Sequence, residues 1–405
     1  MAFVRVSNRR GNSKDQRTVI FFCIIWIFYP RLTLYPSTSP LSDLEVCRVQ
    51  DSDFSAEVFH SPETFKKDYM DMESKFKIFM YPQTDNDIVC DKQRRLYGKH
   101  ASEGYFFQNL DQSQFLTTDP EKAHLFLVPV HCHKLHAERR SSEETAVAVQ
   151  NFVNSLISKY PYWNRTLGAD HFFVICHDRS TNGTQRISHL VRNSIRVVCS
   201  PSYNVQYVPH KDISLPQIQQ PFTLPPSGNN VTNRTALAFW AGRLNSHIRD
   251  VLIQAWQNDT ELDIQKTRMK LWRIRGHKVH GTPRIAEAIH YGCVPGDISF
   301  LFPSSVLWIV FSVFVYRPAV ILADHYILPF IDILDWRKFS VLLKENDVYQ
   351  LKEILKDIPD SKYRFFQDNT VKVQKHFQWN SPPVSFDAFH MVMYDLWLRR
   401  HVVKY

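Results

Sequence analysis

Arginines beside a predicted strand end are the first residues in this sequence that could do chemistry. The stretch AGRLNSHIRD places Gly242 and Arg243 in a strand-to-helix turn and Arg249 in the first turns of the next helix. A helix N-terminus offers unpaired N–H groups and a guanidinium is cationic, so together they suit a phosphate or another anion. The alternative, a solvated helix face, stays open for Arg249 and is the stronger interpretation for Arg243.

A second pair of charges, Arg284 and Glu287, lies three residues apart in the predicted helix PRIAEAIHYG. At this spacing the two side chains share one face of the helix. A carboxylate there could accept hydrogen bonds from both hydroxyls of a ribose. From the residues alone, an ion pair on the helix surface is the better interpretation.

Candidate proton acceptors follow another predicted strand. The stretch DHFFVICHD ends with His177 and Asp178, and the carboxyl ends of strands face the ligand cleft in open α/β sheets. Either side chain could take a proton from a substrate hydroxyl, and so could His100 or Glu103 in KHASEG. A histidine at a strand end is as often structural, so the base stays unassigned among these residues.

The elements that must position these residues alternate between strands and helices, which predicts an α/β fold with parallel sheets. The first half has predicted strands at 75–81, 123–130, 170–178 and 194–200 and a helix at 142–159. The second half has strands at 236–242 and 319–325 and helices at 246–257 and 283–292. A Pro-, Gly- and Asn-rich linker, 219–234, separates the halves, an arrangement that suits an enzyme with a cleft.

The C-terminus predicts one more helix, with Ser385 as its N-cap and an apolar face that packs back across the domains. That face carries Phe386, Phe389, Met393 and Trp397.

The N-terminus has the charge pattern of a signal anchor. Five cations precede the apolar stretch that begins at Val19, which is the positive-inside arrangement. No small-residue cleavage site follows, so an uncleaved anchor is favoured over a cleaved signal peptide. The net charge of +9 is spread among acids without a basic block, which favours a mildly basic surface over a nucleic-acid footprint.

Glycosylation sequons agree with a luminal body. Their asparagines are Asn164, Asn182, Asn230, Asn233 and Asn258. Apart from Cys23 in the apolar stretch, the cysteines are Cys47, Cys90, Cys132, Cys176, Cys199 and Cys293. An even number in an oxidising compartment permits disulfides, but the spacing does not fix their pairing.

Several longer stretches resemble the plant exostosin-like branch of glycosyltransferase family 47. They run in family order between Lys75 and Pro359, and include KIFMYPQ, YGKHASEGYFFQNL, TDPEKAHLFLVPV, KDISLPQ, FWAGRLNSHIR, TPRIAEAIHYGCVP and VILADHYILPFIDILDWRKFSVLL. The resemblance implies a type II Golgi protein of the GT-B fold. It also implies an inverting transfer of a sugar from a nucleotide-sugar donor, expected to be a UDP-sugar, to a cell-wall polysaccharide such as pectin or hemicellulose.

The resemblance also suggests roles for residues and segments. It puts Arg284 and Glu287 in the donor pocket. The expected partners are the membrane, through the N-terminal anchor, and other Golgi glycosyltransferases. We expect no nucleic-acid partner from the charge pattern and no metal cofactor from the residues. The expected organisation is a cytosolic tail (1–17), a signal anchor (18–36), a stem (37–70), an N-terminal acceptor-side α/β domain (71–228), a C-terminal nucleotide-sugar-binding α/β domain (229–375) with an atypical insert (296–319), and a C-terminal helix (376–405).

Two departures from the family pattern stand out. Relatives carry a strand and Gly-rich loop of the type KFCICPGG before the PRIAEAI helix, and here 263–284 has no Cys-x-Cys-Pro. Relatives also read GCVPVILADHYILPF without a break, whereas here the apolar stretch 296–319 intervenes. A membrane span there would separate the last part of the chain from its partner strands, so we expect an inserted loop.

Two alternative functions stay open. An Asp-x-Asp pair, Asp85 and Asp87, could hold a metal as in GT-A transferases, but it follows the first strand too early for such a site. A catalytically inactive family product, acting at most as a binding or scaffold partner, would explain the departures in the donor half.

Overall fold

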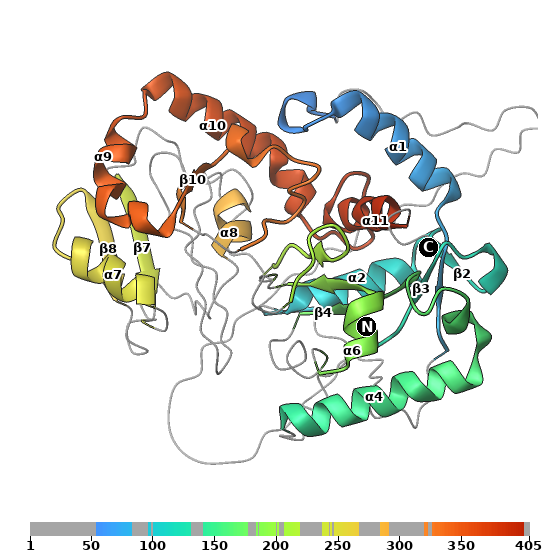
Figure 1. Cartoon of the computed structure of the whole chain (residues 1–405). Helices are drawn as coiled ribbons and strands as arrows, with labels where there is room; N and C mark the ends of the chain where they lie inside the picture. Colours follow the sequence, from blue (N-terminus) through green and yellow to red (C-terminus); the bar gives the residue numbers. More distant parts are fainter. Residues whose placement is uncertain are drawn as a thin grey trace, which may run out of the picture. The chain divides into compact units, whose positions relative to one another are not determined.

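The first half of the chain builds a six-stranded parallel sheet in the order β2-β1-β3-β4-β5-β6. The computed structural model (Figure 1) describes residues 54–82, 96–98, 100–130, 141–176, 184, 186–199, 201, 206–218, 237–242, 244, 247–266, 284–290, 320–322 and 326–400. The strands are β1 (Ile78–Met80), β2 (Leu116–Thr117), β3 (Leu125–Leu127), β4 (His171–Ile175), β5 (Ile195–Val198) and β6 (Ile213–Ser214). The strand order reverses between β1 and β3, so the expectation of a parallel α/β sheet is confirmed.

Helices cover both faces of this sheet (Figure 1). They are α1 (Pro62–Lys75), α2 (Ala101–Asp111), α4 (Ser142–Lys159), α6 (Ser188–Asn193) and, from the C-terminus, α11 (Ala388–Arg399). Phe152 of α4 packs in one cluster with Phe173 of β4, whereas Phe106 of α2 contacts Phe172 of β4 on the opposite face. β4 is therefore buried on both sides, which explains why its five residues are all apolar or hydrogen-bonded.

The second half forms two separate two-stranded parallel sheets among the described residues. One pairs β7 (Ala238–Gly242) with β8 (Leu262–Lys266), and the other pairs β9 (Val320–Leu322) with β10 (Val341–Leu343). The helices here are α7 (His247–Trp256), α8 (Arg284–His290), α9 (Leu351–Lys356) and α10 (Asp360–Val373). A second apolar core joins Trp240 of β7, Leu252 of α7 and Phe366 of α10.

Short 3₁₀ helices complete the described structure: η2 (Ala56–Val58), η3 (Pro120–Lys122), η4 (Pro161–Arg165), η8 (Trp336–Lys338), η9 (Glu345–Gln350) and η10 (Gln374–Phe377). The segment after β9 joins the two halves, because the Ser214 hydroxyl of β6 donates to the Ile327 carbonyl over 3.0 Å. Residues from Asp51 onward therefore form one unit.

The expected stem, 37–70, extends too far along the chain. From Phe54 onward these residues belong to the folded unit, and α1 buries Phe65 and Tyr69. Tyr69 stacks on Phe386 with the ring centroids 4.4 Å apart, and Phe65 meets the edge of Tyr394 at 4.7 Å. Phe65, Tyr69 and Met72 form the helical stripe that makes this packing possible.

The N-cap of the C-terminal helix also differs from the expectation. Asp387 rather than Ser385 caps α11, because its Oδ1 accepts the His390 N–H over 3.1 Å. Phe386 lies before the helix at φ 66°, while Phe389, Met393 and Trp397 are buried as expected.

The predicted anchor and the insert 296–319 lie outside the described residues. Within the described part of the chain, no helix combines the length and the apolar character needed to cross a bilayer.

Candidate active site

The carboxyl ends of β4 and β5 are joined by a disulfide between Cys176 and Cys199. Each cysteine directly follows its strand, and the last residues of the two strands, Ile175 and Val198, are register partners. The bond therefore fixes neighbouring strand ends at the edge where parallel α/β sheets bind ligands.

Two side chains at the N-terminus of α2 are hydrogen-bonded to the backbone N–H and carbonyl of Cys176. The Cys176 N–H donates to Glu103 Oε2 over 2.9 Å, and the Cys176 carbonyl accepts from His100 Nδ1 over 3.0 Å. Glu103 is 7% exposed, so its carboxylate is committed to a buried backbone donor. Because Nδ1 of His100 donates, the neutral imidazole carries its lone pair on Nε2.

Ser102, between these two residues, holds α2 against the residues that follow β6. Its hydroxyl donates to the Pro216 carbonyl and accepts the Ile218 N–H, both over 2.9 Å. The Trp379 indole N–H donates to the same Pro216 carbonyl over 3.1 Å. We call Leu215–Ile218 the β6 tail; it is fixed from two directions.

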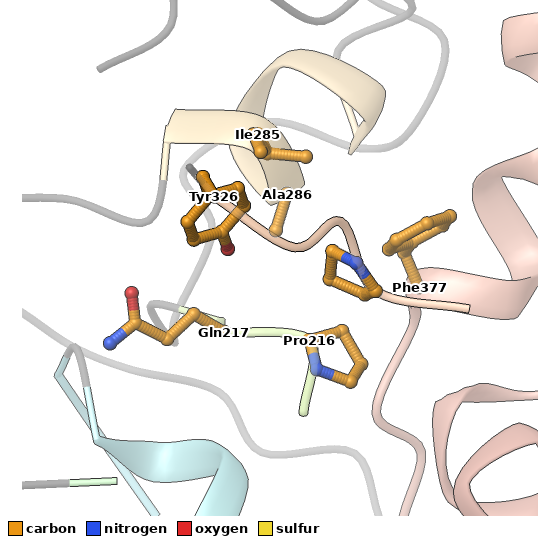
Figure 2. Close-up of a pocket in the computed structure, with 7 residues that line it drawn as sticks. Pro216, Gln217, Ile285, Ala286, Tyr326 and Phe377 are labelled. Atoms are coloured by element: carbon orange, nitrogen blue, oxygen red, sulfur yellow. The ribbon is translucent and has the colours of Figure 1, made fainter. Parts of the chain in front are cut away.

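A pocket lies between the β6 tail and α8 (Figure 2). In Figure 2, Ile285 and Ala286 face Pro216 and Gln217 across it, with Tyr326 beside them. Pro329 and Phe377 complete the lining, and the empty volume is about 270 Å³, part of it open to solvent. The pocket is mostly apolar, with an amide and a phenol as its polar groups, which is the composition of a small-molecule site.

Four of the predicted donor-binding residues lie in described helices or strands. Arg284 begins α8 and Glu287 lies in its first turns, so the backbone of this helix flanks the pocket through Ile285 and Ala286. Gly242 ends β7, and Arg249 lies in the first turn of α7, as the sequence predicts. Arg249 is only 2% exposed, so the alternative of a solvated helix face is wrong for this residue.

The remaining candidates lie outside the described residues: Arg243, His177, Asp178 and the Asp85/Asp87 pair. His177 directly follows Cys176, so the backbone leading into the predicted base is the one that His100 and Glu103 hold. The two further base candidates, His100 and Glu103, both lie at this edge, and each is hydrogen-bonded to a different backbone group of Cys176.

Two buried polar networks were not foreseen from the sequence. In the first, Tyr81 donates to His171 Nε2 over 2.7 Å, and His171 Nδ1 donates to Asp170 over 2.7 Å. Burial lowers the pKa of His171, although the hydrogen bond to Asp170 opposes this shift. Both ring nitrogens are engaged, so this histidine supports the sheet.

The second network explains the stretch KDISLPQ. Asp212 accepts from Arg196 over 2.6 Å and from Lys211 over 2.5 Å, and it is fully buried. Lys211 also donates to the Ser194 carbonyl over 2.6 Å. Burial lowers the pKa of Lys211, and the charge of Asp212 opposes this shift. The network fixes the loop that leads into β6.

Two further predictions concern metal binding and glycosylation. Across the described ranges, no group of three His, Cys, Asp or Glu side chains could hold a metal ion. Asn164 and Asn258 are exposed, as glycosylation requires, and the other three sequon asparagines, Asn182, Asn230 and Asn233, lie outside the described residues.

Comparison with known proteins identifies the family. The Exostosin GT47 domain matches residues 72–358. Two proteins of Arabidopsis thaliana named "Probable glycosyltransferase" are each 32% identical, one over 388 residues (90% of this chain, 68% of its own) and one over 405 residues (91% and 77%). A "Probable beta-1,4-xylosyltransferase" of the same plant is 25% identical over 368 residues (80% and 81%).

These matches cover the sheet, the disulfide-linked edge, the β6 tail and α8. The relatives include xylosyltransferases and glucuronosyltransferases by name, so the resemblance read from the sequence is confirmed. The chain belongs to the exostosin GT47 family, and it is a glycosyltransferase.

Proposed function

We propose that this protein transfers a sugar from a UDP-sugar donor to a plant cell-wall polysaccharide, with inversion at the anomeric carbon. The observation that carries the proposal is the pocket that joins the β6 tail of the first half to α8 of the second. On one side, Pro216 accepts a hydrogen bond from Ser102, which lies between the base candidates His100 and Glu103, and the other side is the helix of Arg284 and Glu287. A transferase needs both functions at one cleft.

The proposed architecture is GT-B, with two Rossmann-like domains. Two observations support it: the apolar core around Phe126 and Phe173 is built from first-half residues, and the core around Trp240 from second-half residues. The donor would lie on α7 and α8, where Arg249 and the helix N-termini favour the negative charge of a diphosphate. Glu287 would accept hydrogen bonds from the ribose hydroxyls.

The chemical step follows from inversion. An acceptor hydroxyl oxygen attacks the anomeric carbon, the bond from that carbon to the diphosphate oxygen breaks, and UDP leaves with the bonding electrons. The hydroxyl proton passes to a base at the acceptor side. Arg243 and Arg249 would stabilise the charge that develops on the leaving diphosphate, so we propose transfer without a bound metal.

The names of some relatives guide the choice of sugar and polymer to test. These relatives are named probable xylosyltransferases and probable glucuronosyltransferases. We therefore propose UDP-xylose and UDP-glucuronate as the first donors to test, with xylan and xyloglucan oligosaccharides as acceptors. Pectic oligosaccharides form the second acceptor set.

We further propose that the protein is a single-pass type II Golgi membrane protein with a luminal body. The five cations before Val19 and the sequons support this topology. Glycosidase treatment of microsomal protein should increase its gel mobility, and the body should resist protease until the membrane is opened. A body that external protease digests in sealed microsomes excludes this topology.

Donor binding is tested by thermal unfolding of the full chain with UDP. UDP should raise the melting temperature with concentration, reaching about 2.7 kcal/mol of stabilisation at a hundred times Kd. ADP is the control for recognition of the uracil ring. EDTA should leave the stabilisation by UDP unchanged. The two departures from the family pattern, at 263–284 and 296–319, favour one alternative, an inactive family product, and an absent UDP shift would support it.

A further inference from the structure

We propose that Gln217 is a sugar-specificity residue, whose side-chain amide hydrogen-bonds a hydroxyl of a sugar ring bound between the β6 tail and α8. This inference rests on the proposed glycosyl transfer and names the part of the substrate that the pocket would hold.

The β6 tail holds the backbone of Gln217 from both sides. The Pro216 carbonyl, which precedes Gln217, accepts from the Ser102 hydroxyl over 2.9 Å and from the Trp379 indole N–H over 3.1 Å. The Ile218 N–H, which follows it, donates to the same Ser102 hydroxyl over 2.9 Å. Pro216 and Ile218 are buried, whereas Gln217 is half-buried and lines the pocket. A ligand of Gln217 therefore meets a backbone that is already ordered, which favours binding.

The side chain of Gln217 has no structural task in the described part of the chain. It makes no hydrogen bond to any other described residue. Figure 2 shows it reaching from the β6 tail, with its amide at the end of the pocket away from Phe377. An amide has donors and an acceptor, so it can bond to a sugar hydroxyl in either sense.

The walls that face Gln217 are also held by hydrogen bonds. On α8, the Ile289 carbonyl accepts from the Gln374 amide over 2.9 Å. The carbonyl of Pro329, another lining residue, accepts from the Trp336 indole N–H over 2.9 Å. Each wall keeps its position through contacts outside the pocket, as expected of a preformed small-molecule site.

The lining suits a sugar ring. A pyranose has apolar C–H faces and an edge of hydroxyl groups. Ile285, Ala286 and Phe377 offer apolar surface for the faces, and Tyr326 adds an aromatic ring. The amide of Gln217 can then select for a hydroxyl at the edge, because a few polar groups in an apolar pocket fix orientation and specificity.

The uracil ring is a second candidate for this pocket, since it is also flat with a polar edge. The proposed donor site uses the second half, through α7 and α8, for the nucleotide. Gln217 comes from the first half, which carries the base candidates. The sugar that reacts must lie between the two, so we assign the pocket to a sugar ring of the donor or of the acceptor.

The test measures Kd by calorimetry in the full chain for UDP, UDP-xylose, UDP-glucuronate and a xylan oligosaccharide. Gln217→Leu keeps a side chain of similar size without the amide. It should raise Kd for a sugar-nucleotide or for the oligosaccharide about three- to tenfold, as expected for one neutral hydrogen bond, and leave Kd for UDP within twofold. Gln217→Asn, which withdraws the amide by one methylene, is the second variant and should show the same pattern.

The two sources of the ring give different results. A higher Kd for a sugar-nucleotide would assign the ring to the donor, and a higher Kd for the oligosaccharide alone would assign it to the acceptor. The rate of transfer should fall through KM for the same substrate.

The control is Gln150→Leu, at an exposed glutamine of α4, which should leave all four Kd values within twofold of wild type. The melting temperature verifies that each variant is folded. If the Gln217 variants leave every Kd unchanged, or raise Kd for UDP as much as for the sugar-nucleotides, the inference is wrong while the proposed function stands. If the wild type binds no UDP and transfers no sugar, the proposed function fails, and the assignment of Gln217 fails with it.

Discussion

The hydroxyl of Ser102 is hydrogen-bonded on both sides to the β6 tail, donating to Pro216 and accepting from Ile218. Ser102→Ala would leave the buried Ile218 N–H without this acceptor, whereas Pro216 keeps the Trp379 donor. We expect a loss of about 1–3 kcal/mol in the free energy of unfolding and weaker UDP binding. Ser74→Ala, at an exposed serine of α1, should change stability by less than about 0.5 kcal/mol. Equal effects of the two substitutions would show that the Ser102 bridge contributes nothing.

The disulfide should stabilise the protein by restricting the unfolded chain, by an amount that grows slowly with the length of the loop it closes. Cys176 and Cys199 are 23 residues apart, and a loop of that size corresponds to about 3 kcal/mol. Dithiothreitol should therefore lower the melting temperature of the wild type. The Cys176→Ser/Cys199→Ser variant should start lower and be insensitive to dithiothreitol. A reductant effect of the same size in the variant would assign it to other cysteines.

A buried carboxyl on α11 should make stability depend on pH. Burial raises the pKa of Asp395 to about 6, the charge of Arg399 opposes this and the charge of Asp332 adds to it. Among the described residues, Tyr207 and Tyr394 are also ionisable groups near Asp395. Since the folded state holds the proton more tightly than the unfolded state, this contribution is fully present below about pH 4. It is lost as pH rises through about 6.

Asp395→Asn should remove this dependence. The stability of the wild type relative to the variant should increase by up to about 3 kcal/mol between pH 7 and pH 4. Chemical unfolding at several pH values measures it, and Asp368→Asn, on the exposed face of α10, is the matched control. A constant difference across this range would mean that Asp395 is ionised throughout.

Glu287 should affect the donor and not the fold. Glu287→Ala should raise Kd for UDP at least tenfold in calorimetry and leave the melting temperature without ligand within a few degrees. Glu353→Ala, at an exposed glutamate of α9, should leave Kd unchanged. Unchanged UDP binding by Glu287→Ala would instead support an ion pair with Arg284 on the surface of α8.

Deleting the insert tests whether its residues harm the donor half. β9 begins at Val320, directly after 296–319, and pairs with β10. Deleting 296–319 should raise the soluble yield, because we expect this apolar insert to form an exposed loop, and exposed apolar surface promotes aggregation. Under the alternative of an inactive family product, restoring a Cys-x-Cys-Pro segment before Gly276 should also be needed for transfer. A wild type as soluble and monodisperse as the deletion variant would contradict the expectation for the insert, and an active wild type would exclude the inactive alternative.

Elements with strong local patterns could be predicted from the sequence. The helix expected at 142–159 is α4, whose Ser141/Glu144 capping box marks its start, and strands with continuous apolar runs, such as β4, lie where expected. The missed strands are short or polar: β2 and β6 have two residues each, and β8 reads LDIQK. Their pairing comes from sheet neighbours, which sequence periodicity does not contain.

The candidate site divides in the same way. The types and positions of His100 and Glu103 were visible in KHASEG, but their shared partner, Cys176, depends on how α2 packs at the strand ends. The disulfide had a signal, since each cysteine lies near the carboxyl end of a predicted strand, 170–178 and 194–200, but the sequence left the pairing open. The β6 tail and Tyr326 carried no chemical pattern, and only the fold brings them to the pocket.

The first described residues determine where a secreted version of the enzyme can begin. Phe59 bridges to Leu334, the Asp335 N–H donates to the Val58 carbonyl over 2.9 Å, and Phe54 stacks on Phe65 with the ring centroids 5.9 Å apart. A truncation at residue 70, the expected end of the stem, would uncover apolar surface next to the segment that supplies Tyr326 and Pro329. An expression boundary between residues 37 and 51 would remove the proposed anchor and keep this lining intact.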